Sequence, residues 1–402
     1  MRVVMLTKRS TLTILALLLA PFVLVGCGSD KTTSPIRDLA TAPENVRYSR
    51  GFFIPAYFVL DQQNKIELNQ KFDFIIAPRL EDASGINSGS IVIKTGVAGS
   101  TSNNESYLDE WSEIDKHEDW FMHSSSTSSP ENRISLAPNY PNLFWMDIGS
   151  RGWKNFVVSK YKEVVEDNPT IDGVFVDGPP DPSEYIGTLG SAHPTYSASE
   201  YEAKAVEILL AIRSAIGSNK IMVSNSNLCK SFTAVADGNM NEGFVHFGGW
   251  PNSRQESKAE WLSEVNAIAD TDFNGKYLLI GSGSKEETLS SMVEYCYASF
   301  LVGYNASSHA YFYWHSNAEG CYGTLFWSDL WEMTIGEPLG DRLESDGTYR
   351  RNLTQGVVLA NPNDVGEPIT VSLDASYLNS VGDTVTSVTL PNKSGAVLKK
   401  LD

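Results

Sequence analysis

An aspartate at the end of an apolar run is the clearest candidate for chemistry in this sequence. Asp177 follows the apolar segment 174–176 and precedes the Gly-Pro-Pro segment 178–180, which forces a turn. A carboxylate directly after a buried run loses hydration free energy, so it needs hydrogen-bond partners or a chemical role. Asp177 could instead cap the loop that follows it. We predict that Asp177 is a catalytic carboxylate at the carboxyl end of a strand.

A second carboxylate, Glu242, lies inside the segment Asp237–His246, two strand units after Asp177. Two carboxylates that flank one site can hydrolyse a glycosidic bond, because one protonates the leaving oxygen while the other attacks the anomeric carbon or activates water. The alternative is an exposed glutamate in a loop. If the two side chains converge, they predict a glycosidase, and the distance between them decides between retention and inversion of the anomeric carbon.

Further polar and aromatic residues near strand ends could bind the substrate. They are Asp147, Asn225, His246, Trp250, Tyr313 and Trp314. The asparagine could hydrogen-bond a sugar hydroxyl and the two tryptophans could stack on sugar faces, although each of the six could equally be structural. The 6 histidines show no H-E-x-x-H or paired metal spacing, so we expect no metal and no other cofactor. The sequence has no G-x-S-x-G elbow, which disfavours a Ser-His-Asp hydrolase.

Strand-like and helix-like segments alternate between about residue 50 and residue 320. Strands that are apolar throughout, separated by amphipathic helices, indicate a parallel sheet covered by helices. Eight such units over about 270 residues match a (β/α)8 TIM barrel, an α/β fold whose active site lies at the carboxyl ends of the strands. An open doubly wound sheet is the alternative, but no G-x-G-x-x-G follows a strand, so its nucleotide-binding versions lose support. We place the barrel at residues 47–335.

Nine runs have the composition of strands. They are Phe72–Ala77, Ser90–Lys94, Trp120–His123, Leu143–Asp147, Val174–Asp177, Ile221–Asn225, Gly238–Phe244, Tyr277–Ile280 and Ala310–Trp314. We assign Leu143–Asp147 to a loop, because it is short and close to the next helix. Gly51–Phe58 could cover the barrel floor or add a strand. With this count, Asp177 ends the fourth strand and Glu242 the sixth, near enough to point at one substrate.

The pattern changes in residues 336–402, where short β-rich runs are separated by turn clusters. The clusters include Asn361-Pro362-Asn363 and the segment 391–395. This spacing predicts a small all-β module.

The N-terminus has the pattern of a targeting signal. Arg2, Lys8 and Arg9 precede an apolar run, Leu12–Val25, and the run ends in Leu-Val-Gly-Cys at Cys27. This ending resembles the bacterial lipobox, which implies cleavage before Cys27 and diacylglycerol on its thiol. A plain signal peptide or an anchor helix is the alternative. We therefore expect a lipoprotein signal peptide at 1–26, a flexible tether at 27–46 and attachment to a membrane through the lipid. Because residue 28 is not Asp, the pattern implies the outer membrane.

The formal net charge of −18 disfavours nucleic acid as a partner, since an acidic protein repels the phosphate backbone. Cys229, Cys296 and Cys321 show no C-x-x-C spacing. We therefore expect them to be small apolar groups rather than zinc or redox sites.

Three segments together resemble a known family. Asp-Gly-Val-Phe-Val-Asp at 172–177 resembles the strand-four signature of glycoside-hydrolase TIM barrels related to the endo-polygalactosaminidases. The segments 146–153 and 390–398 resemble the family's helix opening before strand four and its terminal β-module. The nearest group is hypothetical glycosyl hydrolase family 15, over roughly residues 48–400.

The resemblance implies a (β/α)8 fold and action on a glycan. It makes Asp177 the strand-four nucleophile or base and Glu242 the strand-six general acid/base. The sixth strand departs from the family pattern, because it reads Gly-Asn-Met-Asn-Glu rather than a smooth apolar run.

We predict a lipid-anchored glycoside hydrolase of carbohydrate metabolism that cleaves an extracytoplasmic polysaccharide or oligosaccharide. The alternative is a non-catalytic glycan-binding surface lipoprotein on the same barrel. The enzyme needs Asp177 and Glu242 to converge, whereas the binding protein does not.

Overall fold

A computed structural model describes residues 51–53, 61–77, 86, 91–98, 100–102, 110–136, 140–180, 182, 185, 196–248, 254–284, 290–316 and 326–401. The expected signal peptide, tether and lipidated Cys27 lie outside these residues, as do Trp250 and Cys321. Within the described ranges, no helix has both the length and the apolar character needed to cross a membrane.

The central sheet of the described chain contains a run of parallel strands that pair in chain order. They are β1 (Gly51–Phe53), β2 (Phe74–Ala77), β3 (Ile91–Val97), β7 (Gly173–Asp177), β8 (Ile221–Asn225), β9 (Gly238–Asn241), β12 (Tyr277–Ser284) and β13 (His309–Ser316). The two ends of the run meet, because a Cβ on Gly51 of β1 would lie 2.7 Å from Cβ of Tyr311 on β13. The (β/α)8 barrel is therefore confirmed.

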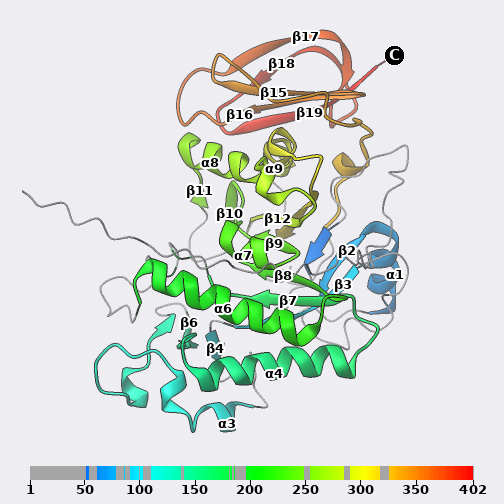
Figure 1. Cartoon of the computed structure of the whole chain (residues 1–402). Helices are drawn as coiled ribbons and strands as arrows, with labels where there is room; N and C mark the ends of the chain where they lie inside the picture. The colour runs from blue at the N-terminus through cyan, green and yellow to red at the C-terminus, as the bar shows by residue number, and fades with distance from the viewer. Residues whose placement is uncertain are drawn as a thin grey trace, which may run out of the picture. The chain divides into compact units, whose positions relative to one another are not determined.

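Helices connect most of these strands (Figure 1). They are α1 (Gln62–Lys71), α4 (Arg151–Asp167), α6 (Ala198–Ile216), α7 (Lys230–Val235), α8 (Lys258–Ile268) and α9 (Ser290–Gly303). The starts of α6 and α8 are fixed by capping boxes, in which Ser197 pairs with Glu200 and Ser257 with Glu260. The short strands β10 (His246–Gly248) and β11 (Arg254–Gln255) come between β9 and α8 and pair at the end of β12.

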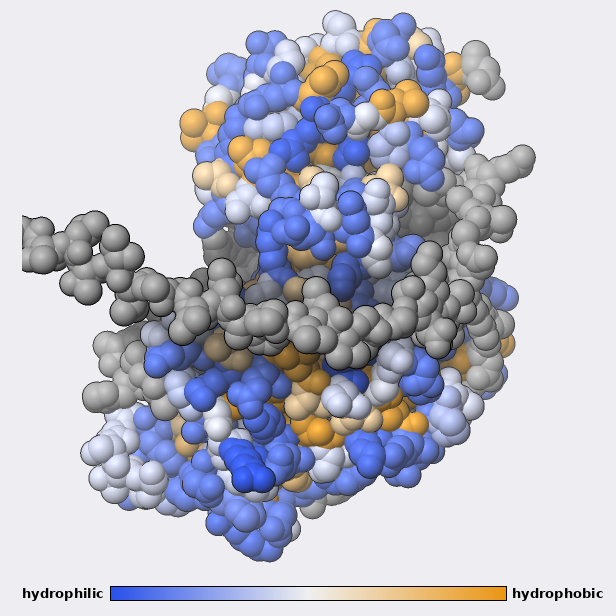
Figure 2. Space-filling model, in the orientation of Figure 1, coloured by the Kyte–Doolittle hydropathy of each residue, from blue (hydrophilic) through white to orange (hydrophobic). Residues whose placement is uncertain are grey.

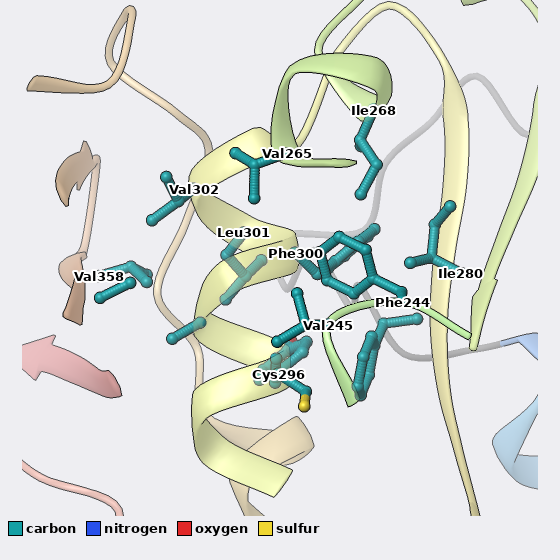
Figure 3. Packing of buried hydrophobic residues seen from close by; sticks show 14 of the residues in the cluster. Phe244, Val245, Val265, Ile268, Ile280, Cys296, Phe300, Leu301, Val302 and Val358 are labelled. Carbon is teal, nitrogen blue, oxygen red and sulfur yellow. The ribbon is translucent and has the colours of Figure 1, made fainter. Parts of the chain in front are cut away.

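Two layers of apolar side chains hold the barrel together. Alternate residues of the strands fill its interior; they include Phe74, Phe175, Val223, Met240, Leu279 and Tyr313. The intervening residues face outward and pack against the helices, as Ile280 of β12 does on the side of Phe300 of α9 in Figure 3. Burying one such side chain contributes about 1.5–3 kcal/mol.

The chain between β3 and α4 forms a separate small sheet beside the barrel strands. Its antiparallel strands are β4 (Ser100–Ser102), β5 (Ser135–Leu136) and β6 (Tyr140–Trp145), and the short helix α3 (Trp111–Ile114) lies between β4 and β5. Leu143–Asp147, which we assigned to a loop, thus overlaps a strand of this sheet. The prediction of a barrel strand at Trp120–His123 is wrong. That segment ends a 3₁₀ turn, Glu118–Trp120, and then makes isolated bridges from Phe121 to Met146 and from His123 to Arg133.

The barrel's first strand is β1, in the run that we left open between a floor segment and a strand. The sequence analysis thus left β1 out of its count of barrel strands and wrongly counted Trp120–His123 as one. The two errors cancel, so Asp177 does end the fourth barrel strand and Glu242 does follow the sixth.

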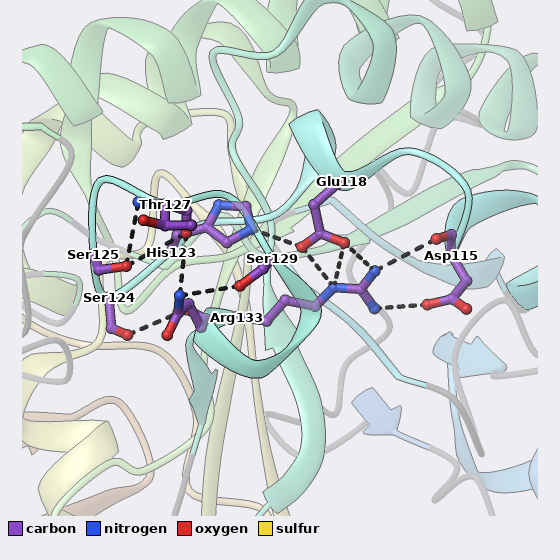
Figure 4. Close-up of polar contacts among 9 residues, drawn as sticks. Asp115, Glu118, His123, Ser124, Ser125, Thr127, Ser129 and Arg133 are labelled. Carbon is purple, nitrogen blue, oxygen red and sulfur yellow. Dashed lines mark hydrogen bonds and ion pairs between the residues drawn. The ribbon is translucent and has the colours of Figure 1, made fainter.

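Arg133 organises the charges of this small sheet (Figure 4). Its guanidinium donates to both oxygens of Glu118 at 2.6–3.2 Å and to Asp115 at 2.7 Å. It also lies 3.7 Å from the centre of the Phe121 ring. His123 contacts the same Glu118 at 2.7 Å. The cation therefore joins the segment Asp115–Glu118 to the segment that leads into β5 through opposite charges.

The C-terminal segment forms an antiparallel sheet, which confirms the all-β module. Along the sheet its strands run β14 (Leu343–Ser345), β15 (Thr348–Leu353), β16 (Gly356–Asn361), β19 (Ser394–Lys400), β17 (Ile369–Leu378) and β18 (Thr384–Leu390). Val358 and Val397 belong to the same apolar cluster as α8 and α9. On the face seen in Figure 2, hydrophobic residues of this module are scattered among hydrophilic ones. The boundary at residue 335 stays a prediction.

Candidate active site

Because side chains alternate between the two faces of a strand, three polar side chains come together at the barrel mouth. Side chains two residues apart on a strand point the same way. The last interior core residues of three neighbouring strands are Phe175, Val223 and Met240. The residues two positions beyond them are Asp177, Asn225 and Glu242. These three therefore form the layer directly above the interior core, at the carboxyl ends of β7, β8 and β9.

The turn predicted after Asp177 is present. Gly178 has a φ of 70°, in the left-handed region that favours glycine, and the chain leaves the sheet there. The carbonyl of Asp177 accepts a hydrogen bond from the backbone N–H of Ala98 at 3.0 Å, which fixes the strand end against the neighbouring segment. The backbone that carries the carboxylate is thus held on the β3 side, while β8 pairs on the other.

One amide joins the two carboxylates. Nδ2 of Asn225 donates to Oδ1 of Asp177 at 3.2 Å and to Oε2 of Glu242 at 3.1 Å. Those two oxygens can therefore be no farther apart than both bonds laid end to end, 6.3 Å. Because the two N–H bonds of an amide diverge by about 120°, the expected separation is about 5.5 Å. The structure thus brings Asp177 and Glu242 within reach of one amide, and their catalytic roles stay a prediction.

Burial and mutual repulsion raise the pKa values of both acids. Burial raises the pKa of Asp177 to about 6, the charge of Glu242 adds to the rise, and the Asn225 hydrogen bond opposes it. Burial also raises the pKa of Glu242, again opposed by Asn225. Because each negative charge disfavours the other, the two acids titrate as a coupled pair.

The sequence model of a family described as hypothetical glycosyl hydrolase family 15 matches residues 94–357. The chain belongs to this family. The match spans the barrel from β3 to β13 and includes Asp177, Asn225 and Glu242. A comparison with curated proteins finds no match.

Solved structures are similar to this chain at low sequence identity. Amy13B from Eubacterium rectale has a TM-score of 0.51 at 10% identity, with 89% of this chain and 97% of that chain covered. The glycoside hydrolase domain of PelA from Pseudomonas aeruginosa has a TM-score of 0.45 at 12% identity, covering 64% and 93%. Ega3 from Aspergillus fumigatus, solved in complex with galactosamine, has a TM-score of 0.42 at 12% identity, covering 68% and 93%. The family and the barrel make this protein a glycoside hydrolase that acts on a carbohydrate.

Tyr313 and Trp314 are neighbours on β13, and the alternation of side chains along the strand turns them to opposite faces of the barrel sheet. Tyr313 points into the interior core, and its hydroxyl donates to Sδ of Met240 at 3.8 Å. Burial raises the pKa of this phenol well above its usual range and the charge of Glu242 raises it further, so Tyr313 lies close to Glu242, beneath the acid pair. Trp314 points the other way, is only 2% exposed and packs in the outer core. It offers no ring face to a sugar, so the stacking assignment for Trp314 is wrong.

Asp147 has a partner that the sequence analysis missed. Its carboxylate accepts hydrogen bonds from the backbone N–H of Gly149 at 2.9 Å and from the hydroxyl of Tyr196. Burial raises the pKa of Tyr196 beyond its usual range, and the Asp147 hydrogen bond raises it further, so the phenol stays protonated. Nζ of Lys204 lies 5.0 Å from the centre of the same ring. Tyr196 directly precedes the capping box of α6 in the sequence. That position was the signal that could have drawn attention to Tyr196.

The remaining predicted residues are placed as follows. His246 begins β10, is 7% exposed, and its N–H donates to the carbonyl of Phe244 at 2.6 Å. Cys296 is buried and Cys229 is half-buried, both as free thiols. Within the described residues, no group of three His, Cys, Asp or Glu side chains is arranged to hold a metal ion.

Proposed function

We propose that this protein is a lipid-anchored glycoside hydrolase that cleaves an extracytoplasmic polysaccharide, with Asp177 as nucleophile and Glu242 as general acid/base. The observation that carries the proposal is the single Asn225 amide shared by the two carboxylates. The amide orients both acids toward one point above the barrel core. That point is where the glycosidic bond of a bound substrate would lie.

The spacing of the acids favours retention of anomeric configuration. Retaining enzymes hold their carboxyl groups about 5–5.5 Å apart, whereas inverting enzymes leave about 6.5–9.5 Å for a water molecule. An upper bound of 6.3 Å between the bonded oxygens fits the first class. In the first step Glu242 protonates the leaving oxygen while the carboxylate of Asp177 attacks the anomeric carbon and forms a glycosyl ester. In the second step Glu242 removes a proton from water, which hydrolyses that ester.

The protonation states of the two acids set a condition on this mechanism. Attack requires an ionised Asp177, and a pKa of about 6 means that this carboxyl is half ionised at about pH 6 and largely ionised about one pH unit higher. Protonation of the leaving group requires a proton on Glu242, whose pKa is raised by burial. We expect activity to fall on the acid side as Asp177 becomes protonated.

The acid pair is costly to fold, which argues against the non-catalytic alternative. Each buried carboxylate with a raised pKa destabilises the folded state at neutral pH. A binding protein could recognise sugar hydroxyls with neutral side chains and avoid that repulsion. Asp147 and its Tyr196 partner supply further polar groups that could recognise sugar hydroxyls.

The anchor rests on the N-terminal sequence. Replacing Cys27 by Ser should stop incorporation of radiolabelled palmitate and release the protein from the membrane fraction or block its processing. Unchanged labelling of Cys27→Ser would contradict the anchor while leaving the enzymatic proposal intact.

The experiment that tests the enzymatic proposal is a polysaccharide panel assayed for new reducing ends. The mature wild-type protein should cleave at least one polymer, and Asp177→Asn should lower that activity by about 10³-fold or more. Glu163→Gln, a change of an exposed carboxylate on α4, serves as the matched control and should retain full activity. Full activity of Asp177→Asn would mean that the catalytic pair is misassigned.

A further inference from the structure

The turn that carries Glu242 has a strained backbone. We refer to Asn241–His246 as the Glu242 turn. Val245 in this turn has a φ of 61°, a conformation that β-branched residues rarely adopt. The residue before it, Phe244, is fixed to β12, because its N–H donates to the carbonyl of Gly281 at 2.8 Å and its carbonyl accepts from the hydroxyl of Ser282 at 2.6 Å. Such a conformation persists only when the surroundings hold it.

A carboxylate from helix α8 binds the Glu242 turn on both sides of the catalytic residue. Oε2 of Glu264 accepts the backbone N–H of Val245 at 2.8 Å. Glu264 is also hydrogen-bonded to the side chain of Asn241, whose Oδ1 in turn accepts the N–H of Gly243 at 3.0 Å. One side chain thus fixes the residue before Glu242 and the strained residue three positions after it.

A second carboxyl group, that of Glu256, completes this arrangement. Its side chain is hydrogen-bonded to Glu264, and its backbone N–H donates to the carbonyl of Val245 at 3.3 Å. An ionised carboxylate can only accept hydrogen bonds, so two carboxyl groups that bond to each other must share a proton. Burial and the charge of Glu256 hold the pKa of Glu264 well above its usual range.

Other groups face the pair from the elements packed around it. The thiol of Cys296 on α9 lies near both carboxyl groups and is hydrogen-bonded to Ser282 on β12. Burial raises the pKa of Tyr295 on α9, and the charge of Glu256 contributes to the rise. Lys393 donates to the backbone carbonyl of Glu256 at 2.6 Å and is paired with Asp364 at 2.7 Å, so its charge is already matched.

We propose that Glu264, sharing a proton with Glu256, is a positioning residue that holds the Glu242 turn and sets the alkaline limit of catalysis. The effect on catalysis rests on the proposed role of Glu242 as general acid/base. When the shared proton leaves at high pH, two adjacent buried carboxylates repel each other. The bonds from Glu264 to Val245 and Asn241 then change, and Glu242 loses its position above the core.

Two substitutions of Glu264 distinguish a role in positioning Glu242 from a role in the stability of the fold. The amide of Glu264→Gln can accept from Val245 and donate to Glu256, which imitates the shared-proton state at every pH. We expect its kcat near neutral pH to lie within about twofold of wild type and its alkaline limb to move to higher pH. Glu264→Ala removes the bonds, so we expect kcat to fall by about tenfold or more with KM little changed, as for a misplaced catalytic group. Glu163→Gln on α4 is the matched control and should leave both the pH profile and kcat unchanged.

Amide hydrogen exchange of the peptide containing the Glu242 turn provides a readout that needs no substrate. Exchange should be faster in Glu264→Ala than in wild type at one fixed pH, and unchanged in Glu264→Gln and in the control. Wild-type exchange of this peptide in Glu264→Ala, or a wild-type alkaline limb in Glu264→Gln, would overturn the proposal. If the wild-type protein cleaves no glycan, the proposed function fails and the exchange measurement alone decides whether Glu264 holds the turn.

Discussion

Two clusters of charged side chains in this molecule differ in their composition: one pairs opposite charges and the other brings like charges together. Around Arg133 a cation meets Glu118 and Asp115, and the Arg133 hydrogen bonds hold the pKa of Glu118 below its usual value. At the barrel mouth two acids meet with a neutral amide between them, and both have raised pKa values. The first arrangement is what stability alone would select. The second sacrifices stability, which is the pattern expected of a catalytic site.

The largest effect should come from removing the acid/base at the mouth. Glu242→Ala should lower polysaccharide cleavage by about 10²–10⁴-fold, because a sugar leaving group needs a proton. An aryl glycoside with an acidic phenol needs none, so the glycosylation step on that substrate should be nearly as fast as in wild type. Pre-steady-state release of the phenol measures this step. An equal loss on both substrates would mean that Glu242 does not act as the acid.

The next effect should come from breaking the opposite-charge cluster. Arg133→Met leaves Glu118 and Asp115 without their cation, and the arginine side chain is only 5% exposed. Because Asp115 is 52% exposed and water screens it, we expect a loss of about 2–3 kcal/mol rather than the full value for a buried pair. Chemical denaturation measures the loss. The kcat of the folded fraction should not change, and a large drop in kcat with unchanged stability would contradict the distinction between the two clusters.

The smallest effect should be a gain in stability at the mouth. The pKa of Asp177 is raised in the folded state, so folding is weakened as pH rises from about 4 to about 6 and stays weakened above that range. Asp177→Asn removes this penalty, which a shift of about two pKa units sets at no more than about 3 kcal/mol. Its thermal midpoint should equal that of wild type near pH 4 and exceed it near pH 7. A midpoint below that of wild type at pH 7 would show that the charge of Asp177 is stabilising.

The local pattern of the sequence was enough to locate Asp177 but not to choose between neighbours. An apolar run that ends in a carboxylate and a turn is a local signal, so the strand end was predicted. Tyr313 and Trp314 are adjacent, and the sequence did not show which of them faces the interior, so a stacking role was given to Trp314, which packs in the outer core. Asn225 was expected to bind sugar, but its link to both acids depends on three strands meeting.

Long-range contacts account for what the sequence could not show. Tyr196 reaches Asp147 across 49 residues, and Glu264 reaches Val245 from the next helix. The apolar run at Trp120–His123 looks like a barrel strand, yet it makes only isolated bridges to Met146 and Arg133, next to the small sheet. The fold class and the acid pair were therefore predictable, whereas the residues that position the pair were not.

The most direct test of the central claim is to trap the glycosyl ester. In Glu242→Ala the second step lacks its general base, so an activated aryl glycoside of a sugar that the enzyme accepts should leave the ester on the protein. Mass spectrometry of the digested protein should find the added sugar mass on the peptide that contains Asp177. The added mass on another peptide, or turnover with inversion and no ester, would contradict the assignment of Asp177 as the nucleophile of a retaining pair.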